Sequence, residues 1–367
     1  MNKNHSRYRE IFDAAIAETL SQAIRIIAAD PALVISGMRI LRNQKKAAAR
    51  RKKHADEGLL VPPIMIVSIT SRCNLACAGC YMHGRTEKTA GEMSSEILVS
   101  VSEEAAELGV SIMVIAGGEP LVRLDEILRM AQDHPAILFP VFSNGLLIDA
   151  ALADRIARYR NIVPVISFEG FRKETDTRRG AGVYDRLLET CTLLKSRNIF
   201  FGCSLTATRE NFDRITSETF IRQMIGTGAR VFTFVEYVPM KPGTGDLVLS
   251  PEQKQNLIAI LSVFNQKFPA LFIGFPGDED PYGGCLAAGR GFIHVSPSGN
   301  VEPCPAAPFA DVNLGRVSLK SALQSRFLRE IRTHHHKLTE TNGGCALWTN
   351  REWAQKILAD PPGDHQD

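Results

Sequence analysis

The chain has 367 residues, of which 44% are hydrophobic and 23% charged, and its net charge is +3 at pH 7. These values are those of an ordinary globular protein and exclude a chain that is disordered throughout. The sequence contains no apolar run of about 18 residues, which argues against a transmembrane helix. Eight cysteines in motif-like positions favour metal ligation in a reducing compartment over disulfides.

The N-terminal segment is predicted to be helical. Residues 7–28 carry apolar side chains at helical spacing, which indicates an amphipathic helix. Asp30-Pro31 ends this helix, and a second helix is predicted from about residue 32 to 54. The polar start of the chain lacks the apolar core of a signal peptide, so we expect a cytoplasmic protein. Residues 1–60 are assigned to a helical, basic N-terminal extension.

The second predicted helix carries a basic segment without acidic residues. Eight basic residues lie in it: Arg39, Arg42, Lys45, Lys46, Arg50, Arg51, Lys52 and Lys53. One interpretation is a solvated helix face whose apolar side packs on the core. The other is contact of residues 39–53 with an anionic membrane surface, which would place the protein peripherally at the inner membrane. Nucleic acid is not expected as a partner, because no aromatic platform accompanies the charge.

From residue 61 onward, apolar β-like runs alternate with helical patterns. The runs lie at 64–69, 111–116, 137–142, 162–168, 199–206 and 230–237, and helices are predicted at 94–108, 184–196 and 220–226. Near-continuous apolar strands separated by helices predict a parallel sheet covered by helices. Six such units indicate an open, partial β/α barrel over residues 61–245. In parallel α/β barrels the loops after the strands hold the active site.

Three cysteines follow the first predicted strand. Cys73, Cys77 and Cys80 are separated by three and then two residues. Such a set of thiolates suits an iron–sulfur cluster. Because no fourth cysteine lies nearby, one iron of a cubane cluster would be free to bind a small molecule. Structural zinc is the alternative, but zinc sites favour paired Cys-x2-Cys units and four ligands.

The next three strands also end in polar or glycine-containing turns. Gly117-Gly118-Glu119-Pro120 follows the second strand, Ser143-Asn144-Gly145 the third, and Glu169-Gly170 the fourth, with Thr177-Arg178-Arg179-Gly180 just beyond. The two glycines let the backbone approach a ligand closely, and a glutamate can accept a hydrogen bond from an ammonium group. Plain turns, and a surface ion pair for the arginines, are the alternative interpretations.

The Cys73–Cys80 loop, followed directly by Tyr81, resembles the signature of the radical S-adenosylmethionine (SAM) enzymes over residues 62–245. The resemblance implies a [4Fe-4S] cluster on Cys73, Cys77 and Cys80. It also implies that SAM is cleaved reductively to a 5′-deoxyadenosyl radical, which abstracts a substrate hydrogen. A reducing protein such as a flavodoxin or ferredoxin would supply the electron. The implied cofactor-binding residues are Tyr81, Gly117, Gly118, Glu119, Ser143, Asn144, Glu169 and Arg179.

Two details of this resemblance concern the fourth strand end. Many relatives have Asp where Glu169 stands, and Arg179, directly before a glycine, is favoured over Arg178 as the partner of the methionine carboxylate. No catalytic acid or base is assigned.

The C-terminal third resembles an auxiliary-cluster domain of the SPASM or shorter twitch type. After a connecting helix at about 251–268, within a linker segment 246–280, Cys285 precedes a hairpin predicted around Gly299, and Cys304 and Cys345 follow. The resemblance implies one auxiliary [4Fe-4S] cluster on Cys285, Cys304 and Cys345 in a small α+β domain at 281–350. Its fourth position is left to another residue, water or substrate. A cluster-free fold is the alternative, and 351–367 form a tail.

These features predict a radical SAM enzyme. Its substrate is expected to be either a peptide, as for many relatives with such a domain, or a lipid-like or membrane-associated molecule, which a basic two-helix N-terminus fits. The competing hypothesis is a non-catalytic iron–sulfur protein for electron transfer or binding. It would explain the cysteines but not the cofactor-like motifs at successive strand ends.

Overall fold

The computed structural model describes residues 3–26, 28, 31–85, 91–277, 279–338 and 345–359. Its centre is one curled sheet with the strand order β7-β6-β5-β4-β3-β2-β1-β8-β9. All neighbouring strands pair in parallel except β8 and β9. The strands are β1 (Ile64–Ser68), β2 (Ile112–Ala116), β3 (Phe139–Ser143), β4 (Ile162–Phe168), β5 (Gly202–Ala207), β6 (Val231–Glu236), β7 (Leu271–Phe275), β8 (Phe292–Val295) and β9 (Val301–Glu302).

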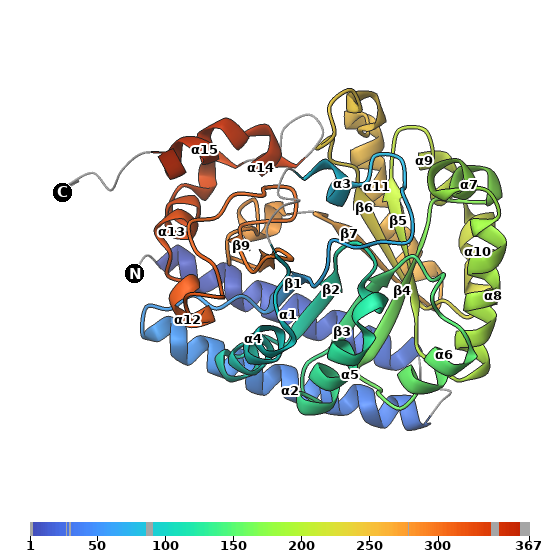
Figure 1. The fold of residues 1–367 in the computed structure, drawn as a ribbon, viewed down its shortest axis with the longest axis horizontal. Coiled ribbons are helices and arrows are strands. Elements are labelled where there is room, and N and C mark those ends of the chain that lie inside the picture. The colour runs from blue at the N-terminus through green and yellow to red at the C-terminus, as the bar shows by residue number, and fades with distance from the viewer. Residues whose placement is uncertain are drawn as a thin grey trace.

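The six strands predicted from the sequence are confirmed, and two more parallel strands extend the sheet. β7 lies in the segment predicted to be a linker and pairs with β6. β8, predicted as part of the C-terminal hairpin, pairs with β1 on the other side of the sheet, where β9 is the last strand. The ring centroids of Phe275 in β7 and Phe292 in β8 are 5.2 Å apart. β7 therefore approaches β8, and the sheet curls almost into a closed barrel (Figure 1).

Helices cover the outside of this sheet. They are α4 (Ser95–Leu108), α5 (Leu124–Asp133), α6 (Ala150–Ile156), α7 (Arg172–Arg179), α8 (Val183–Ser196), α9 (Phe212–Ile215), α10 (Glu218–Thr227) and α11 (Pro251–Lys267). Their ends follow local sequence signals. Ser94 caps α4 by accepting a hydrogen bond from the Ile97 N–H, and Ser250 and Gln253 form a reciprocal capping box on α11.

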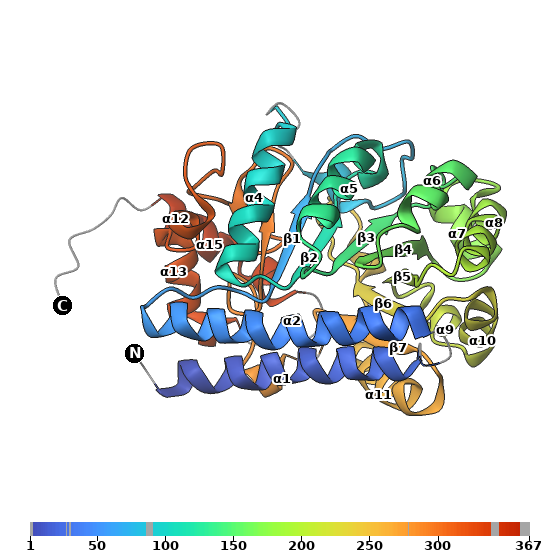
Figure 2. The ribbon, with the colours of Figure 1, turned by 90° about the horizontal axis from the view of Figure 1, so that it is seen from below.

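The N-terminal extension is a helical hairpin of α1 (Lys3–Ile26) and α2 (Pro31–Asp56), as predicted. Pro31 opens the second helix, because proline fits the first helical turn. The buried Arg51 of α2 pairs with Asp13 of α1 and donates to the carbonyl of Gly109, just before β2. The hairpin is thereby fixed at the amino-terminal ends of the strands. Figure 2 shows the two helices side by side along the barrel.

The C-terminal part packs beside β8 and β9. It contains α12 (Leu319–Ala322), α13 (Arg326–Thr333), α14 (Ala346–Thr349) and α15 (Arg351–Ala359). The helix breaks between α12 and α13 because the Ser325 side chain accepts from the Leu328 N–H and caps a new helix. The remaining short elements are α3 (Tyr81–Gly84) and the 3-10 turns at Pro120–Arg123, Gly245–Leu247, Asp280–Tyr282 and His335–Lys337. Within the described ranges, no helix combines the length and apolarity needed to cross a bilayer.

Candidate functional site

The loop between β1 and α3 carries Cys73, Cys77 and Cys80, all half-buried. Both of its ends are held by hydrogen bonds. At its start, the Glu92 carboxylate accepts from the backbone N–H of Ser71 at 2.8 Å and from the hydroxyls of Thr70 and Ser71. Farther along, the Ala78 N–H donates to the Arg178 carbonyl at 3.0 Å. The cysteines thus sit on a loop anchored to the barrel rather than on a free surface loop.

The end of β3 reaches this loop. The Asn144 Nδ2 lies 3.7 Å from the Cys73 Sγ and donates to the Asn74 Oδ1 at 2.7 Å, while the Leu75 N–H points at the same sulfur at 3.4 Å. Hydrogen bonds to ligating sulfurs tune an iron–sulfur cluster. The structure therefore places Asn144, which follows the third predicted strand, beside the cysteine loop.

Glu119 connects the Gly-Gly-Glu-Pro turn to the end of β3. Its Oε1 accepts from the Ser143 hydroxyl at 2.8 Å and the Leu121 N–H at 3.0 Å, and its Oε2 accepts from the Asn144 N–H at 2.7 Å. Burial raises the pKa of the Glu119 carboxyl, against the effect of these hydrogen bonds. A carboxylate has about four lone-pair sites. Three are used here, so an ammonium group can still be accepted, and this role of Glu119 stays a prediction.

The glycines before Glu119 have a structural reason of their own. A Cβ on Gly117 would lie 2.4 Å from the Thr70 carbonyl oxygen, and one on Gly118 would lie 2.2 Å from that of Arg72. Gly117 also has a φ of 136°, which disfavours any other residue. The two glycines therefore let the second strand end pack directly against the start of the cysteine loop. Their contact with SAM stays a prediction.

Glu169, at the turn after β4, accepts hydrogen bonds from both arginines at the end of α7. Its Oε1 accepts from Arg178 Nη1 at 2.6 Å and from Arg179 Nη2 at 2.6 Å. The other oxygen, Oε2, is buried and has no hydrogen-bond partner among the described residues. The sequence favoured Arg179 over Arg178 for a carboxylate ligand. In the structure Arg178 also contacts the cysteine loop, because its Nε donates to the Ala78 carbonyl.

Burial disfavours the thiolate form of two cysteines in the loop. Burial raises the pKa of Cys73, and it raises that of Cys77 against the opposing positive charge of Arg179. Iron binds the thiolate, so a cluster must displace these protons. The donor set itself fits a [4Fe-4S] cluster, since three soft ligands lie on one loop and face the cavity described below.

The three C-terminal cysteines come together from separate elements. Cys285 precedes β8, Cys304 follows β9 and Cys345 precedes α14, and all three are buried. A hydrogen bond joins the thiols of Cys304 and Cys345, and this bond together with burial raises the pKa of Cys304. Over the described ranges, no group of three or more His, Cys, Asp or Glu forms a site for a single metal ion. A cubane cluster spreads its ligands over several irons, and three grouped thiols fit that requirement.

A network of hydrogen-bonded side chains, which the sequence did not reveal, runs between the two cysteine groups. Tyr81 hydrogen-bonds Ser68, whose Oγ lies 2.9 Å from the His294 Nε2. The His294 Nδ1 lies 2.6 Å from the Glu302 Oε2, and Glu302 pairs with Arg85. Burial raises the pKa of the Tyr81 phenol. Tyr81 follows Cys80, and Glu302 lies two residues before Cys304. This series of hydrogen bonds therefore connects the two candidate cluster sites.

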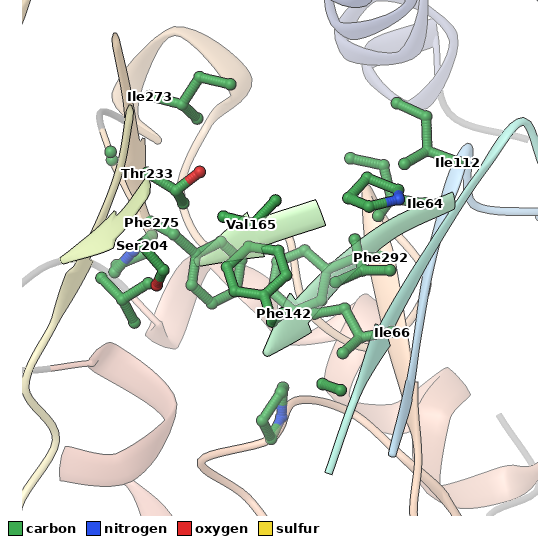
Figure 3. Close-up of a pocket in the computed structure, with 18 of the residues that line it drawn as sticks. Ile64, Ile66, Ile112, Phe142, Val165, Ser204, Thr233, Ile273, Phe275 and Phe292 are labelled. Atoms are coloured by element: carbon green, nitrogen blue, oxygen red, sulfur yellow. The ribbon is translucent and has the colours of Figure 1, made fainter. Parts of the chain in front are cut away.

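One cavity of about 740 Å³ connects these features. It is lined at its upper end by all six candidate cysteine ligands, by Gly117, Gly118 and Asn144, and by Arg178 and Arg179. From there it extends down the barrel lumen to the α1–α2 hairpin. Figure 3 shows lumen side chains from several strands pointing toward the same space.

Residues 67–214 match the family model described as the radical SAM superfamily. The chain carries a radical SAM domain. This domain is that of an enzyme family, which uses a [4Fe-4S] cluster together with SAM. The partial barrel predicted from the sequence is the fold expected of such a domain.

Several characterised proteins are similar to this radical SAM chain. The PqqA peptide cyclase of Granulibacter bethesdensis is 27% identical over 257 residues, covering 67% of this chain and 68% of that protein. The AdoMet-dependent heme synthase of Methanosarcina barkeri is 25% identical and covers 69% and 79%. The mycofactocin maturase MftC of Mycolicibacterium smegmatis is 25% identical and covers 79% and 76%.

Solved structures support the fold. SuiB of Streptococcus suis, bound to S-adenosylmethionine, aligns with a TM-score of 0.60 at 17% identity, over 79% of this chain and 69% of that one. Native anSMEcpe with bound AdoMet aligns with a TM-score of 0.61 at 15% identity, over 81% and 98%. The likeness extends beyond residues 67–214, so the radical SAM domain and part of its flanking segments share this architecture.

Proposed function

We propose that this protein holds a [4Fe-4S] cluster on Cys73, Cys77 and Cys80 and acts on a substrate C–H bond. When bound, the cluster and SAM supply a 5′-deoxyadenosyl radical, which takes a hydrogen atom from the substrate and leaves 5′-deoxyadenosine. The observation that carries the proposal is that the cysteine loop and the polar ends of β2, β3 and β4 open into one cavity. An electron carrier without catalysis has no need of these converging strand ends.

The protein's own residues would position the cofactor. Asn144 and Arg179 line the cavity beside the cysteines and offer an amide and a guanidinium to the polar groups of SAM. Glu119 holds Ser143 and Asn144 in place and keeps one lone-pair site for an ammonium group. Tyr81, which starts α3 directly after Cys80, and Glu169 complete the proposed cofactor-binding set.

A second cluster on Cys285, Cys304 and Cys345 would face the same cavity. All three cysteines line it, as do Cys73, Cys77 and Cys80. A substrate held between the two groups could exchange an electron with this auxiliary site or bind to it. Reduction of the SAM-binding cluster would come from a flavodoxin-like or ferredoxin-like protein. The names of the similar proteins include a peptide cyclase and a heme synthase, so peptide and non-peptide substrates both remain candidates.

The test is anaerobic reconstitution followed by addition of dithionite and SAM. Wild type should form 5′-deoxyadenosine, and a Cys73→Ala/Cys77→Ala/Cys80→Ala variant should form none while keeping part of its iron. A Cys285→Ala/Cys304→Ala/Cys345→Ala variant should keep the iron that Cys73, Cys77 and Cys80 bind. If iron-loaded wild type binds no SAM and forms no 5′-deoxyadenosine, the proposal fails and an electron-transfer or binding role is favoured.

A further inference from the structure

The barrel lumen is hollow rather than packed. Along β2 and β3 the residues that point into the lumen are only partly buried, whereas those under the outer helices are fully buried. Ile273 of β7, which lines the lumen, is 38% exposed. In closed α/β barrels, layers of bulky side chains fill this space. Here the sheet leaves a volume that a ligand can occupy.

The walls of this lumen are almost entirely apolar. All strands from β1 to β8 except β5 contribute aliphatic or aromatic side chains to it, while β5 contributes Ser204 and Thr206. Figure 3 shows labelled lining residues from several of these strands around the space. Ser204 and Thr233, on adjacent strands and paired in register, are among the few polar side chains that the strands contribute. Ligand pockets of this size usually combine an apolar wall with a few polar groups.

An extended peptide does not suit such a lumen. Every peptide residue brings a backbone N–H and C=O, and leaving these groups unpaired in an apolar space is unfavourable. The backbone groups of the surrounding strands are already engaged in the parallel ladders between neighbours. A hydrocarbon chain has no such groups to satisfy, and it gains free energy as its methylenes leave water.

The α1–α2 hairpin forms the floor of the lumen. Ile16 and Leu20 of α1, and Gly37 and Ile40 of α2, line the lower end of the cavity. The hairpin lies at the amino-terminal ends of the strands, opposite the cysteine loop. A chain that enters beneath or between these helices would run up the barrel with its tip toward the SAM site.

The exposed side of α2 carries both aliphatic and basic side chains. Ile35 and Met38 are 58% and 52% exposed. Arg39, Arg42 and Lys46 are also exposed and follow Ile35 at helical spacing on the same side of α2. Exposed aliphatic residues among basic ones are the pattern of helices that lie on anionic membranes.

We propose that the lumen binds the hydrocarbon chain of a membrane lipid, taken up from an anionic membrane surface on which the α1–α2 hairpin rests. The carbon that reacts would be presented to the cofactor at the cysteine loop. This assignment names the substrate class of the site described under Proposed function and rests on it. Binding of the chain itself requires neither the cluster nor SAM, so it can be tested independently.

The first experiment measures binding of cis-parinaric acid, a fluorescent C18 fatty acid, to the reconstituted protein. Each methylene buried contributes roughly fourfold in affinity. Filling the lumen with a Val165→Phe/Thr233→Phe variant should therefore weaken binding at least about tenfold, because several methylenes lose their space. The matched control is Val263→Phe on α11, where the side chain is 55% exposed outside the barrel. Circular dichroism and iron content check that the variants fold.

Two results would overturn the lumen assignment. One is the absence of any fluorescence increase with folded wild type, and the other is equal binding by the filled variant and the Val263→Phe control. Failure of 5′-deoxyadenosine formation would instead overturn the radical chemistry and leave the binding result standing. The two proposals therefore fail in different assays.

The second experiment measures cosedimentation with vesicles of phosphatidylglycerol and phosphatidylcholine in equal parts, against vesicles of phosphatidylcholine alone. Wild type should bind the anionic vesicles preferentially, and an Arg39→Gln/Arg42→Gln/Lys46→Gln variant should lose at least about tenfold in partition. An Arg129→Gln/Arg186→Gln/Arg222→Gln variant removes the same charge from exposed helix faces elsewhere and should bind like wild type. Equal binding by both triple variants would overturn the membrane-docking step.

Discussion

Two hydrogen bonds join Arg178 and Ala78. The Ala78 N–H donates to the Arg178 carbonyl, and the Arg178 Nε donates to the Ala78 carbonyl, each at 3.0 Å. Ala78 lies between Cys77 and Cys80, whereas Arg178 lies at the end of α7, 100 residues later. The position of two candidate iron ligands is therefore fixed by α7, the helix that follows β4.

Removal of the Arg178 side chain should loosen this segment of the loop. Arg178→Ala keeps the backbone bond but loses the Nε donor and one partner of Glu169. We expect a loss of about 1–3 kcal/mol in stability and faster loss of iron to a chelator. Arg172→Ala is the control, because Arg172 lies on the same helix but pairs with Asp185 at the surface. Equal iron loss from the two variants would show that the Ala78 bond does not hold the loop.

Arg179 should behave differently from Arg178. It contacts Glu169 and lines the cavity. Arg179→Ala is expected to weaken SAM binding at least about tenfold, the loss of one charged bidentate partner, with less iron loss than Arg178→Ala. Equilibrium dialysis with SAM measures the first effect, and iron release under chelator measures the second. Unchanged SAM affinity would remove Arg179 from the cofactor-binding set.

Glu302 should be needed for stability, because two buried groups depend on it. It pairs with Arg85 and lies 2.6 Å from the His294 ring nitrogen, and all three side chains are buried. Glu302→Ala removes the buried carboxylate that balances the charge of the Arg85 guanidinium and should cost about 3–5 kcal/mol, measured as a shift in urea unfolding. An Arg85→Met/Glu302→Leu variant, which replaces the pair by apolar groups, should recover part of this loss. If Glu302→Ala loses less than about 1 kcal/mol of unfolding free energy, Glu302 does not stabilise the buried Arg85 and His294 side chains as proposed.

The strands of the barrel were largely predictable, because each buried parallel strand is a near-continuous apolar run. β7 was missed because Leu271–Phe275 follows α11 closely and was absorbed into the predicted linker. The hairpin of β8 and β9 was predicted from its turn residues. The position of β8 beside β1 was not predicted, because pairing between strands more than 200 residues apart leaves no local sequence pattern.

The site was predictable to the extent that its residues sit in motifs at strand ends. The cysteine loop and Asn144 line one cavity, and Glu119 and Glu169 accept hydrogen bonds from Asn144 and Arg179 at its wall. The residues that hold them were missed. Glu92 and His294 act through contacts with Ser71 and Ser68 that only the folded chain creates, and a single Glu or His in the sequence carries no signal of such a role.

Glu92 offers a pH-dependent test of how the start of the cysteine loop is held. Burial would raise the pKa of this carboxyl, but hydrogen bonds from Ser71 and Thr70 and the charge of Arg72 outweigh burial and hold it below 4.5. A carboxyl with a lowered pKa in the folded state binds protons more readily when the chain is unfolded. Its stabilising contribution is therefore complete above 4.5 and is lost as the pH falls through the lower, folded value.

Glu92→Gln should consequently be less stable than wild type near neutral pH, by roughly 1 kcal/mol for a partly exposed hydrogen-bonded carboxylate. The gap between the two proteins should narrow as the pH falls below 4.5, because wild type then also loses the charge. Urea unfolding of both proteins at several pH values between about 3.5 and 7 measures this. Glu103→Gln, at an exposed position on α4, is the control and should track wild type throughout. A gap that stays constant with pH would mean that the shape of the Glu92 side chain, and not its charge, holds the loop.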